Sequence, residues 1–118
     1  MGELEIAISL AENLRHRVGT QPIYVAGIAE IFALCGEENS ARALAATAGL
    51  LTEQSPLSYF RKASLALALK ERTRSLEFLG ASLRGREAEL PWIAADPRFD
   101  GLRVDEVFQS IVRAAVKS

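Results

Sequence analysis

Two aspartates near the C-terminal end have a spacing that could support chemistry. Asp96 and Asp100 stand four residues apart in the stretch DPRFDGLR. Paired carboxylates can divide acid–base work between them or bind a divalent cation. No histidine or cysteine lies nearby to complete such a site. Each aspartate also has a local structural role at a helix start, so the pattern favours a structural interpretation over a catalytic or metal-binding one.

The chain contains one histidine, His16, and one cysteine, Cys35. His16 lies between two arginines on a polar helix face, which predicts a solvent-exposed side chain. Cys35 follows a run of apolar residues near a helix end, which predicts a buried and unreactive thiol. No glycine-rich phosphate loop, H-E-x-x-H or G-x-S-x-G motif occurs. The sequence therefore predicts a protein that is not an enzyme and holds no cofactor and no metal.

The composition is that of an ordinary globular domain, with 118 residues, 49% hydrophobic and 25% charged. The net charge of −1 gives no overall attraction to nucleic acid or membranes. Residues 59–90 carry seven basic and four acidic residues, an excess more typical of a solvated helix face than of a phosphate-binding surface. No apolar run reaches the roughly 18 residues of a membrane span, and the N-terminus lacks the basic start of a signal peptide. A cytoplasmic protein with no membrane contact is expected.

Apolar residues recur at intervals of three and four along the whole chain, which predicts helices and no strands. A first helix is expected at about 3–18. Pro22 can open a second helix, which Gly36 ends. A third helix is expected to begin with a cap at 39–40 and to bury a stripe that continues to Leu51.

The later part of the chain predicts three more helices and leaves a short additional one open around 87–95. Ser55 is expected to be the N-cap of a fourth helix, with Pro56 in its first turn. A fifth helix is expected to begin near Thr73 and to end near Gly85. The last helix is expected at about 105–116.

Internal similarity predicts how these helices are arranged. A shift of 34 positions pairs Pro22 with Pro56, Ala29 with Ala63, and Glu37 with Glu71. A shift of 35 positions gives more identities, but alanine-rich sequences match by chance. The unit is therefore a helical hairpin that recurs every 34 or 35 positions.

A hairpin of this length resembles the tetratricopeptide repeat. Residues 22–53 fit this family best, because Ala29 matches the small residue where the two helices cross and Gly36 matches the glycine of the turn. Residues 56–87 resemble a degenerate second repeat, in which Lys70 replaces the turn glycine. The resemblance implies an all-α, right-handed α-α superhelix built from such hairpins.

The ends of the chain fit the same resemblance. The segment 1–19 resembles the second half of a preceding repeat. The stretch LPWIAADPRFDGLR is similar to the segment W-L-x-x-D-P-x-F-D-x-L-R common at the C-terminus of bacterial tetratricopeptide-type proteins. Residues 88–118 are therefore expected to form a C-terminal cap with a final capping helix, and residues 1–118 a single domain.

Elementary helix chemistry supports a structural role for this C-terminal stretch. Asp96 can accept from the unpaired N–H groups of a short helical turn, and Pro97 at its first position sacrifices no hydrogen bond. Asp105 can cap the next helix in the same way. The end hairpin of a helical stack exposes an apolar face that must be covered. The stretch is expected to aim four apolar side chains at that face: Trp92, Phe99, Leu102 and Phe108.

The resemblance implies a non-enzymatic scaffold or adaptor for protein–protein interactions, as a stand-alone chain or as part of a bacterial regulatory or signalling protein. The first helix of each hairpin in this family lines a concave surface. The corresponding residues here are Ile23, Ala26, Glu30, Ala33, Leu34, Leu57, Phe60, Ser64, Leu67 and Ala68. This mostly apolar surface suits an apolar helix, an extended peptide or a second copy of the chain. The alternative is a nucleic-acid-associated regulatory domain using the basic segment 61–86, which the lack of interleaved aromatic residues disfavours.

Overall fold

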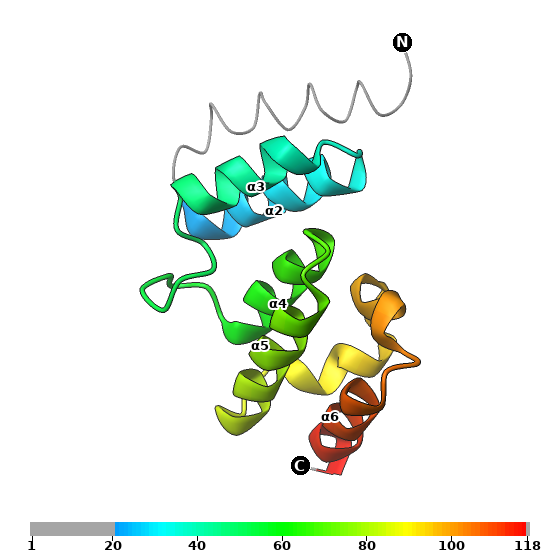
Figure 1. The fold of residues 1–118 in the computed structure, drawn as a ribbon. Coiled ribbons are helices and arrows are strands. Elements are labelled where there is room, and N and C mark those ends of the chain that lie inside the picture. Colours follow the sequence, from blue (N-terminus) through cyan, green and yellow to red (C-terminus); the bar gives the residue numbers. More distant parts are fainter. Residues whose placement is uncertain (1–20, 118) are drawn as a thin grey trace. The chain divides into compact units, whose positions relative to one another are not determined.

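The computed structural model of the protein describes residues 21–117, and every regular element in that range is a helix (Figure 1). The elements are α2 (Pro22–Leu34), α3 (Glu38–Thr47), α4 (Tyr59–Ala68), α5 (Arg72–Arg84), the 3-10 helices η1 (Leu90–Ala95) and η2 (Pro97–Leu102), and α6 (Glu106–Lys117). The all-α class is therefore confirmed for this part of the chain. The expected helix at 3–18, the half-repeat 1–19 and His16 lie outside the described residues.

The chain divides into two compact units, Met1–Leu57 and Ser58–Ser118, and each has its own packing. The boundary falls close to the border expected between the segments 22–53 and 56–87. The expected C-terminal segment 88–118 belongs to the second unit.

In the first unit, α2 and α3 pack against each other as a hairpin. Pro22 begins α2, where a missing N–H costs nothing because the first N–H groups of a helix have no partner within it. Gly36 ends the hairpin's first helix with a φ of 83°, a left-handed conformation that glycine adopts without a Cβ clash. The buried side chains of the hairpin are Val25, Ala26, Ile28, Ala29, Phe32, Ala41, Leu44 and Ala45.

α3 begins and ends earlier than its apolar pattern predicts. Its first residue is Glu38, so the expected cap at 39–40 is wrong. Gly49 has a φ of 61° and follows directly on the last turn, so the helix stops at Thr47. Residues 50–51 are buried from a turn instead. The expected stripe reached Leu51 because residues buried from a turn can continue the apolar spacing of the helix before it.

The connection between α2 and α3 recurs between α4 and α5. The first helix of each pair ends at residue 34 or 68, and the second begins at residue 38 or 72, so both bounds recur after 34 positions. The middle residue of each connection has a positive φ, 83° at Gly36 and 64° at Lys70. At this turn, the structure therefore follows the shift of 34 and not the shift of 35.

The hydrogen bonds of the two connections match one for one. In both turns, the residue with positive φ and the residue after it donate back to the last turn of the helix. The four bonds are Gly36 N–H to Ala33 O (3.1 Å), Glu37 N–H to Phe32 O (2.8 Å), Lys70 N–H to Leu67 O (2.9 Å) and Glu71 N–H to Ala66 O (2.9 Å). Lys70 thus occupies the position of the turn glycine with the same backbone geometry.

α4 begins three residues later than expected, at Tyr59. Its N-cap is Ser58, whose Oγ accepts from the N–H of Arg61 at 3.1 Å. The expected start with Ser55 as cap and Pro56 in the first turn is wrong. Ser55 instead forms a local turn, in which its Oγ accepts from a backbone N–H two residues on at 3.3 Å. Both serines have the chemistry of a cap, and only the backbone path selects between them.

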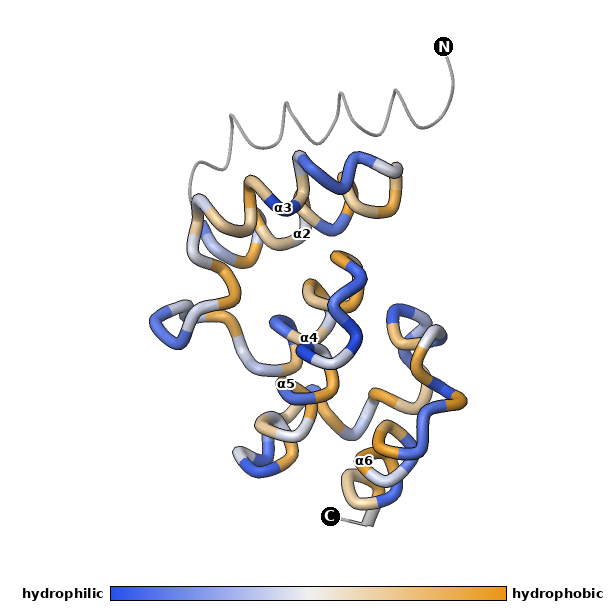
Figure 2. The backbone as a smooth tube through the Cα atoms, in the orientation of Figure 1, coloured by the Kyte–Doolittle hydropathy of each residue, from blue (hydrophilic) through white to orange (hydrophobic). Residues whose placement is uncertain are grey.

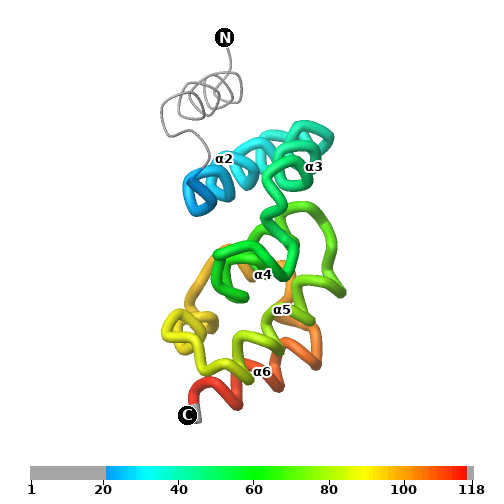
Figure 3. The backbone as a smooth tube through the Cα atoms, turned by 90° about the vertical axis from the view of Figure 1, so that its left-hand side faces the viewer, coloured from blue at the N-terminus to red at the C-terminus, as the bar shows by residue number. Residues whose placement is uncertain are grey.

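Three phenylalanines from different elements form the centre of the second unit. The rings of Phe60 in α4 and Phe99 in η2 meet edge to face at 5.2 Å, and Phe99 stacks on Phe108 of α6 at 6.3 Å. All three side chains are at most 2% exposed. The α6 tube changes between apolar and polar colours within each turn (Figure 2), as expected for a helix with one buried face. α6 packs beside α5 and η1 (Figure 3), and η2 packs on α4.

The caps expected in the C-terminal stretch are confirmed. Oδ1 of Asp96 accepts from the N–H of Arg98 at 3.0 Å, and Pro97 is the first residue of η2. Oδ1 of Asp105 accepts from the N–H groups of Val107 at 2.8 Å and of Phe108 at 3.2 Å. Both donors lie in the first turn of α6. These contacts fix the starts of η2 and α6, and with them the inward direction of the phenylalanines.

The inward position expected for Trp92 is wrong, because this side chain is 74% exposed. It lies in η1, a 3-10 helix, in which residues three apart share a side. Leu90 and Ile93 take that inward side and are 2% and 0% exposed. Trp92 therefore points away from them.

Candidate functional site

The two aspartates with a catalytic spacing are each held by an arginine. The Asp96 carboxylate accepts from Nε of Arg98 at 3.1 Å and from its Nη2 at 2.7 Å. This side-chain hydrogen bond lowers the pKa of Asp96 below its ordinary value of 3.8, and partial burial opposes the shift. Asp100 accepts from Nε of Arg103 at 2.7 Å. A general acid needs a pKa raised towards neutrality, so the arrangement at Asp96 is unsuited to that role.

Arg103 joins the parts of this stretch. Besides the contact with Asp100, its Nη1 donates to the carbonyl of Ala94 at 2.6 Å and its Nη2 to the carbonyl of Asp96 at 3.1 Å. One guanidinium thus ties the end of η1 to the start and end of η2. The polar residues of the stretch are used to hold its fold.

Two features of the described residues concern nucleophile and metal chemistry: the position of Cys35 and the spacing of the metal-ligating side chains. Cys35 lies in the connection between α2 and α3, where it is half-buried and not fully buried as expected. Between residues 21 and 117, no three His, Cys, Asp or Glu side chains gather closely enough to hold a metal ion.

The residues expected to line a concave partner surface differ widely in exposure. Four of them are at most 9% exposed: Ala26, Leu57, Phe60 and Ser64. Phe60 belongs to the aromatic centre described above. Glu30, Ala33, Leu67 and Ala68 are half-buried. Only Ile23 and Leu34 present most of their side chains to solvent. Whether any of these residues contacts a partner stays a prediction.

The large exposed apolar residues among the described residues of the first unit lie on α2. Ile23, Tyr24 and Leu34 are 54%, 53% and 81% exposed, and they are named the α2 stripe here. Ile23 and Leu34 are eleven residues apart, about three helical turns, so they lie on the same side of the helix. An exposed leucine alone is common, but several large apolar residues along one side of a helix are typical of a contact surface.

Three basic residues of segment 61–86 make contacts within the chain. Lys62 is 3% exposed, and its Nζ lies 5.0 Å from the ring centroid of Tyr59. Arg74 approaches the carboxylate of Glu71 at 3.5 Å. Arg72 donates to a backbone carbonyl at the end of η2 at 2.9 Å. The positive charges of these three residues therefore serve contacts within the fold.

The role of Glu87 had no signal in the sequence. Its two carboxylate oxygens accept from the N–H groups of Tyr59 and Phe60, each at 2.9 Å. It therefore caps the first turn of α4 from a distant position in the chain, in favourable interaction with the helix dipole. Sequence rules for capping search only the residues next to a helix, so they miss such a contact.

Comparisons with family models, with curated proteins and with solved structures find no match to this chain. None of the helices between residues 21 and 117 combines the length and the hydrophobicity that a membrane crossing requires.

Proposed function

We propose that this chain is a tetratricopeptide-like helical module that binds another protein through the exposed side of α2. The observation that carries the proposal is the pair of hairpins whose connections repeat at a spacing of 34 with matching hydrogen bonds. Short helical hairpins of this kind stack so that each unit covers its neighbour, and the surface left over serves for binding. In the same proposal the module works in the cytoplasm, within bacterial regulation or signalling.

The burial of matching positions supports the repeat interpretation. Two pairs of positions related by the same shift are buried alike: Ala29 and Ala63 are both 0% exposed, as are Ala41 and Ser75. Small side chains at these positions let the two helices of a hairpin approach closely. In the second hairpin, the Ser75 hydroxyl donates to the carbonyl of Ala63 at 2.8 Å, so serine replaces alanine without leaving an unpaired polar group.

The α2 stripe is the part of the expected partner surface that supports binding. It offers large apolar side chains and one acid, because Glu30 lies seven residues after Ile23 and so on the same side of α2. Such a mostly apolar surface suits an apolar helix, an extended apolar peptide or a second copy of the chain. Buried residues such as Phe60 are left out of the proposed contact.

Substitution of Leu34 tests this surface. Leu34→Glu places a charge on the stripe without disturbing the core, because the side chain is 81% exposed. Ala43→Glu, on the exposed side of α3, is the matched control. Both variants are expected to keep the far-UV circular dichroism spectrum and the melting temperature within the range of surface substitutions.

The binding readouts are sedimentation velocity for self-association and quantitative affinity capture from cells that express the chain. We expect an interaction that the wild type and Ala43→Glu share and Leu34→Glu loses. Equal binding by all three proteins would remove the α2 stripe from the proposal. Binding to random-sequence duplex DNA with a steep dependence on salt would instead support the nucleic-acid alternative.

A further inference from the structure

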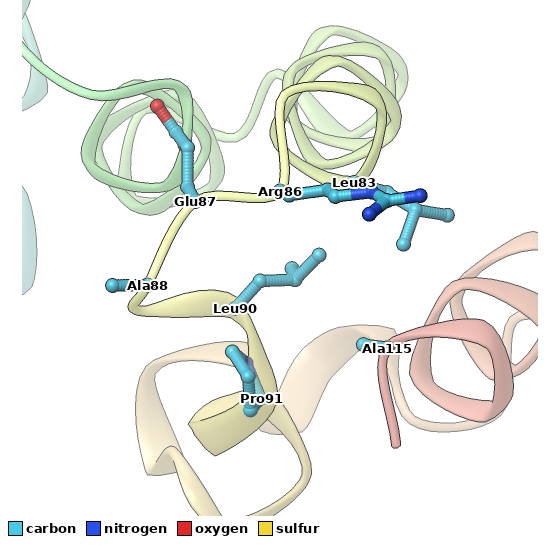
Figure 4. A pocket seen from close by; sticks show the side chains of 7 residues that line it. All are labelled: Leu83, Arg86, Glu87, Ala88, Leu90, Pro91 and Ala115. Atoms are coloured by element: carbon cyan, nitrogen blue, oxygen red, sulfur yellow. The ribbon is translucent and has the colours of Figure 1, made fainter. Parts of the chain in front are cut away.

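A pocket of about 250 Å³ opens within the second unit, where the end of α5, η1 and the last turns of α6 meet (Figure 4). Its interior is apolar. Leu90 and Ala115 are 2% and 4% exposed, and half-buried Leu83 forms a third side. Ala88 and Pro91 line the pocket from exposed positions, so they connect it with the surface.

Two charged residues border the pocket, and they differ in their contacts within the described part of the chain. The Glu87 carboxylate is directed to the start of α4, where both oxygens accept backbone hydrogen bonds (Figure 4). Arg86 lies beside Leu83 on the pocket wall. Among the described residues, the Arg86 guanidinium makes no hydrogen bond or ion pair. The pocket therefore combines an apolar interior with one available cation.

The end of α5 does not cancel this positive charge. The carbonyl groups of its last turn accept hydrogen bonds from the residues that follow, including Arg86 N–H to Leu83 O at 3.1 Å and Glu87 N–H to Ser82 O at 3.1 Å. Carbonyl groups that are already paired add little negative potential at the helix end. Arg86 has a φ of 51°, so its Cα–Cβ direction is set by the left-handed turn and not by the helix.

The size of the pocket limits the ligand. Sites that enclose cofactors or drug-sized molecules measure about 300–1,000 Å³, so a pocket of about 250 Å³ fits a smaller group. Apolar walls favour a short aliphatic or branched body, and a planar guanidinium favours a carboxylate, which it can bind through two parallel hydrogen bonds.

We propose that this pocket binds a small apolar monocarboxylate, with its carboxylate on Arg86 and its hydrocarbon body between Leu83, Leu90 and Ala115. The ligand is a free short-chain acid or the terminal carboxylate of a chain that ends in an aliphatic residue. This site belongs to the second unit and the α2 stripe to the first, so its test does not depend on the partner-binding proposal.

The test uses the intact chain with ¹³C-labelled leucine and alanine methyl groups. The probes are 4-methylpentanoate, the neutral 4-methylpentanamide, and an acetylated glycyl-leucine dipeptide with a free carboxylate. We expect 4-methylpentanoate to shift the methyl signals of Leu83, Ala88 and Ala115 in a saturable way, with a Kd of about 1 mM or below. The amide should bind at least about tenfold more weakly, because it loses the charge-assisted hydrogen bonds.

Two variants and one control connect the binding to this pocket. Arg86→Gln keeps a side chain in the same left-handed turn but removes the charge, and should weaken 4-methylpentanoate about tenfold or more. Ala88→Leu fills the pocket from an exposed position and should abolish binding. Arg84→Gln removes a neighbouring exposed arginine that does not line the pocket, and should bind as the wild type does.

The outcomes separate the proposal from its alternatives. Stronger binding of the dipeptide than of the free acid assigns the site to a chain end, and the reverse order assigns it to a free acid. Equal binding of acid and amide, unchanged binding by Arg86→Gln or Ala88→Leu, or no saturable shift with either carboxylate would each overturn the proposal.

Discussion

Replacing Phe99 with alanine tests the aromatic centre that joins the C-terminal cap to the second unit. The ring is 0% exposed and contacts both Phe60 and Phe108. Truncating a buried phenylalanine to alanine costs about 3–5 kcal/mol. At about 0.05–0.15 kcal/mol per residue, the 61 residues of Ser58–Ser118 are stable by roughly 3–9 kcal/mol. The substitution therefore removes between about a third and all of the stability of this unit.

Urea unfolding followed by far-UV circular dichroism measures the loss. With a slope of about 2 kcal/mol/M, a loss of about 4 kcal/mol lowers the midpoint of the second unit's transition by about 2 M. Val104→Ala is the matched control, because it removes apolar atoms from a side chain that is 84% exposed. Its effect should stay within about 0.5 kcal/mol. If Phe99→Ala and Val104→Ala unfold at the same urea concentration, Phe99 does not anchor the cap.

Three further changes test the turns, the distant cap and the acid–base behaviour. Gly36→Ala should cost about 1 kcal/mol, because a Cβ is strained at a φ of 83°, although beyond the two chain neighbours it would meet no atom within 4 Å. Lys70→Gly should raise the melting temperature, because glycine relieves the same kind of strain at a φ of 64°. Melting temperatures that shift in the same direction for both variants would contradict the matching turns. Glu87→Gln leaves one neutral acceptor oxygen in place of two charged ones, so one of the two bonds to the start of α4 is lost. The change should cost about 1 kcal/mol and speed hydrogen exchange at the first amides of α4 about fivefold. Unchanged exchange there would refute the cap. The folded-state pKa of Asp96 lies below its ordinary value of 3.8, chiefly because of the side-chain hydrogen bond with Arg98. Its ionised carboxylate therefore stabilises the fold at pH values above 3.8, and this stabilisation is lost as the pH falls through the folded-state pKa. Asp96→Asn should therefore flatten the dependence of stability on pH in this acid range, and a curve parallel to that of the wild type would count against the contact.

The helices could be read from the sequence because apolar spacing and local caps are properties of neighbouring residues. Pro22, Gly36, Asp96 and Asp105 act within a few residues of their own positions, and all four were predicted in their structural places. The start of α4 was predicted wrongly for the same reason, because Ser55 lies close to Ser58 and both could cap a helix. Local chemistry alone does not decide between such neighbours.

The surface was harder to predict than the helices. Trp92 was expected inside because of its hydrophobicity, but the threefold period of a 3-10 helix turns it outward. Phe60 was expected on a contact surface, and its burial depends on Phe99, far along the chain. The pocket beside Arg86 is lined by residues of α5, η1 and α6 and of the connection after α5. Because Ala115 is far from the other lining residues in the chain, no single stretch of the sequence predicts the pocket.

The pairing of Phe60 with Phe99 has a consequence for synthesis on the ribosome. The two residues are 39 positions apart, and chains grow at about 5–20 residues per second. Phe60 thus waits roughly 2–8 s after it is made before its partner ring exists, and the carboxylate that caps α4 also arrives only with Glu87. Until Glu87 is added α4 lacks its distant cap, and until Phe99 is added the Phe60 ring lacks this partner. The second unit is therefore completed from its C-terminal end, and its aromatic centre cannot form until translation has passed Phe99.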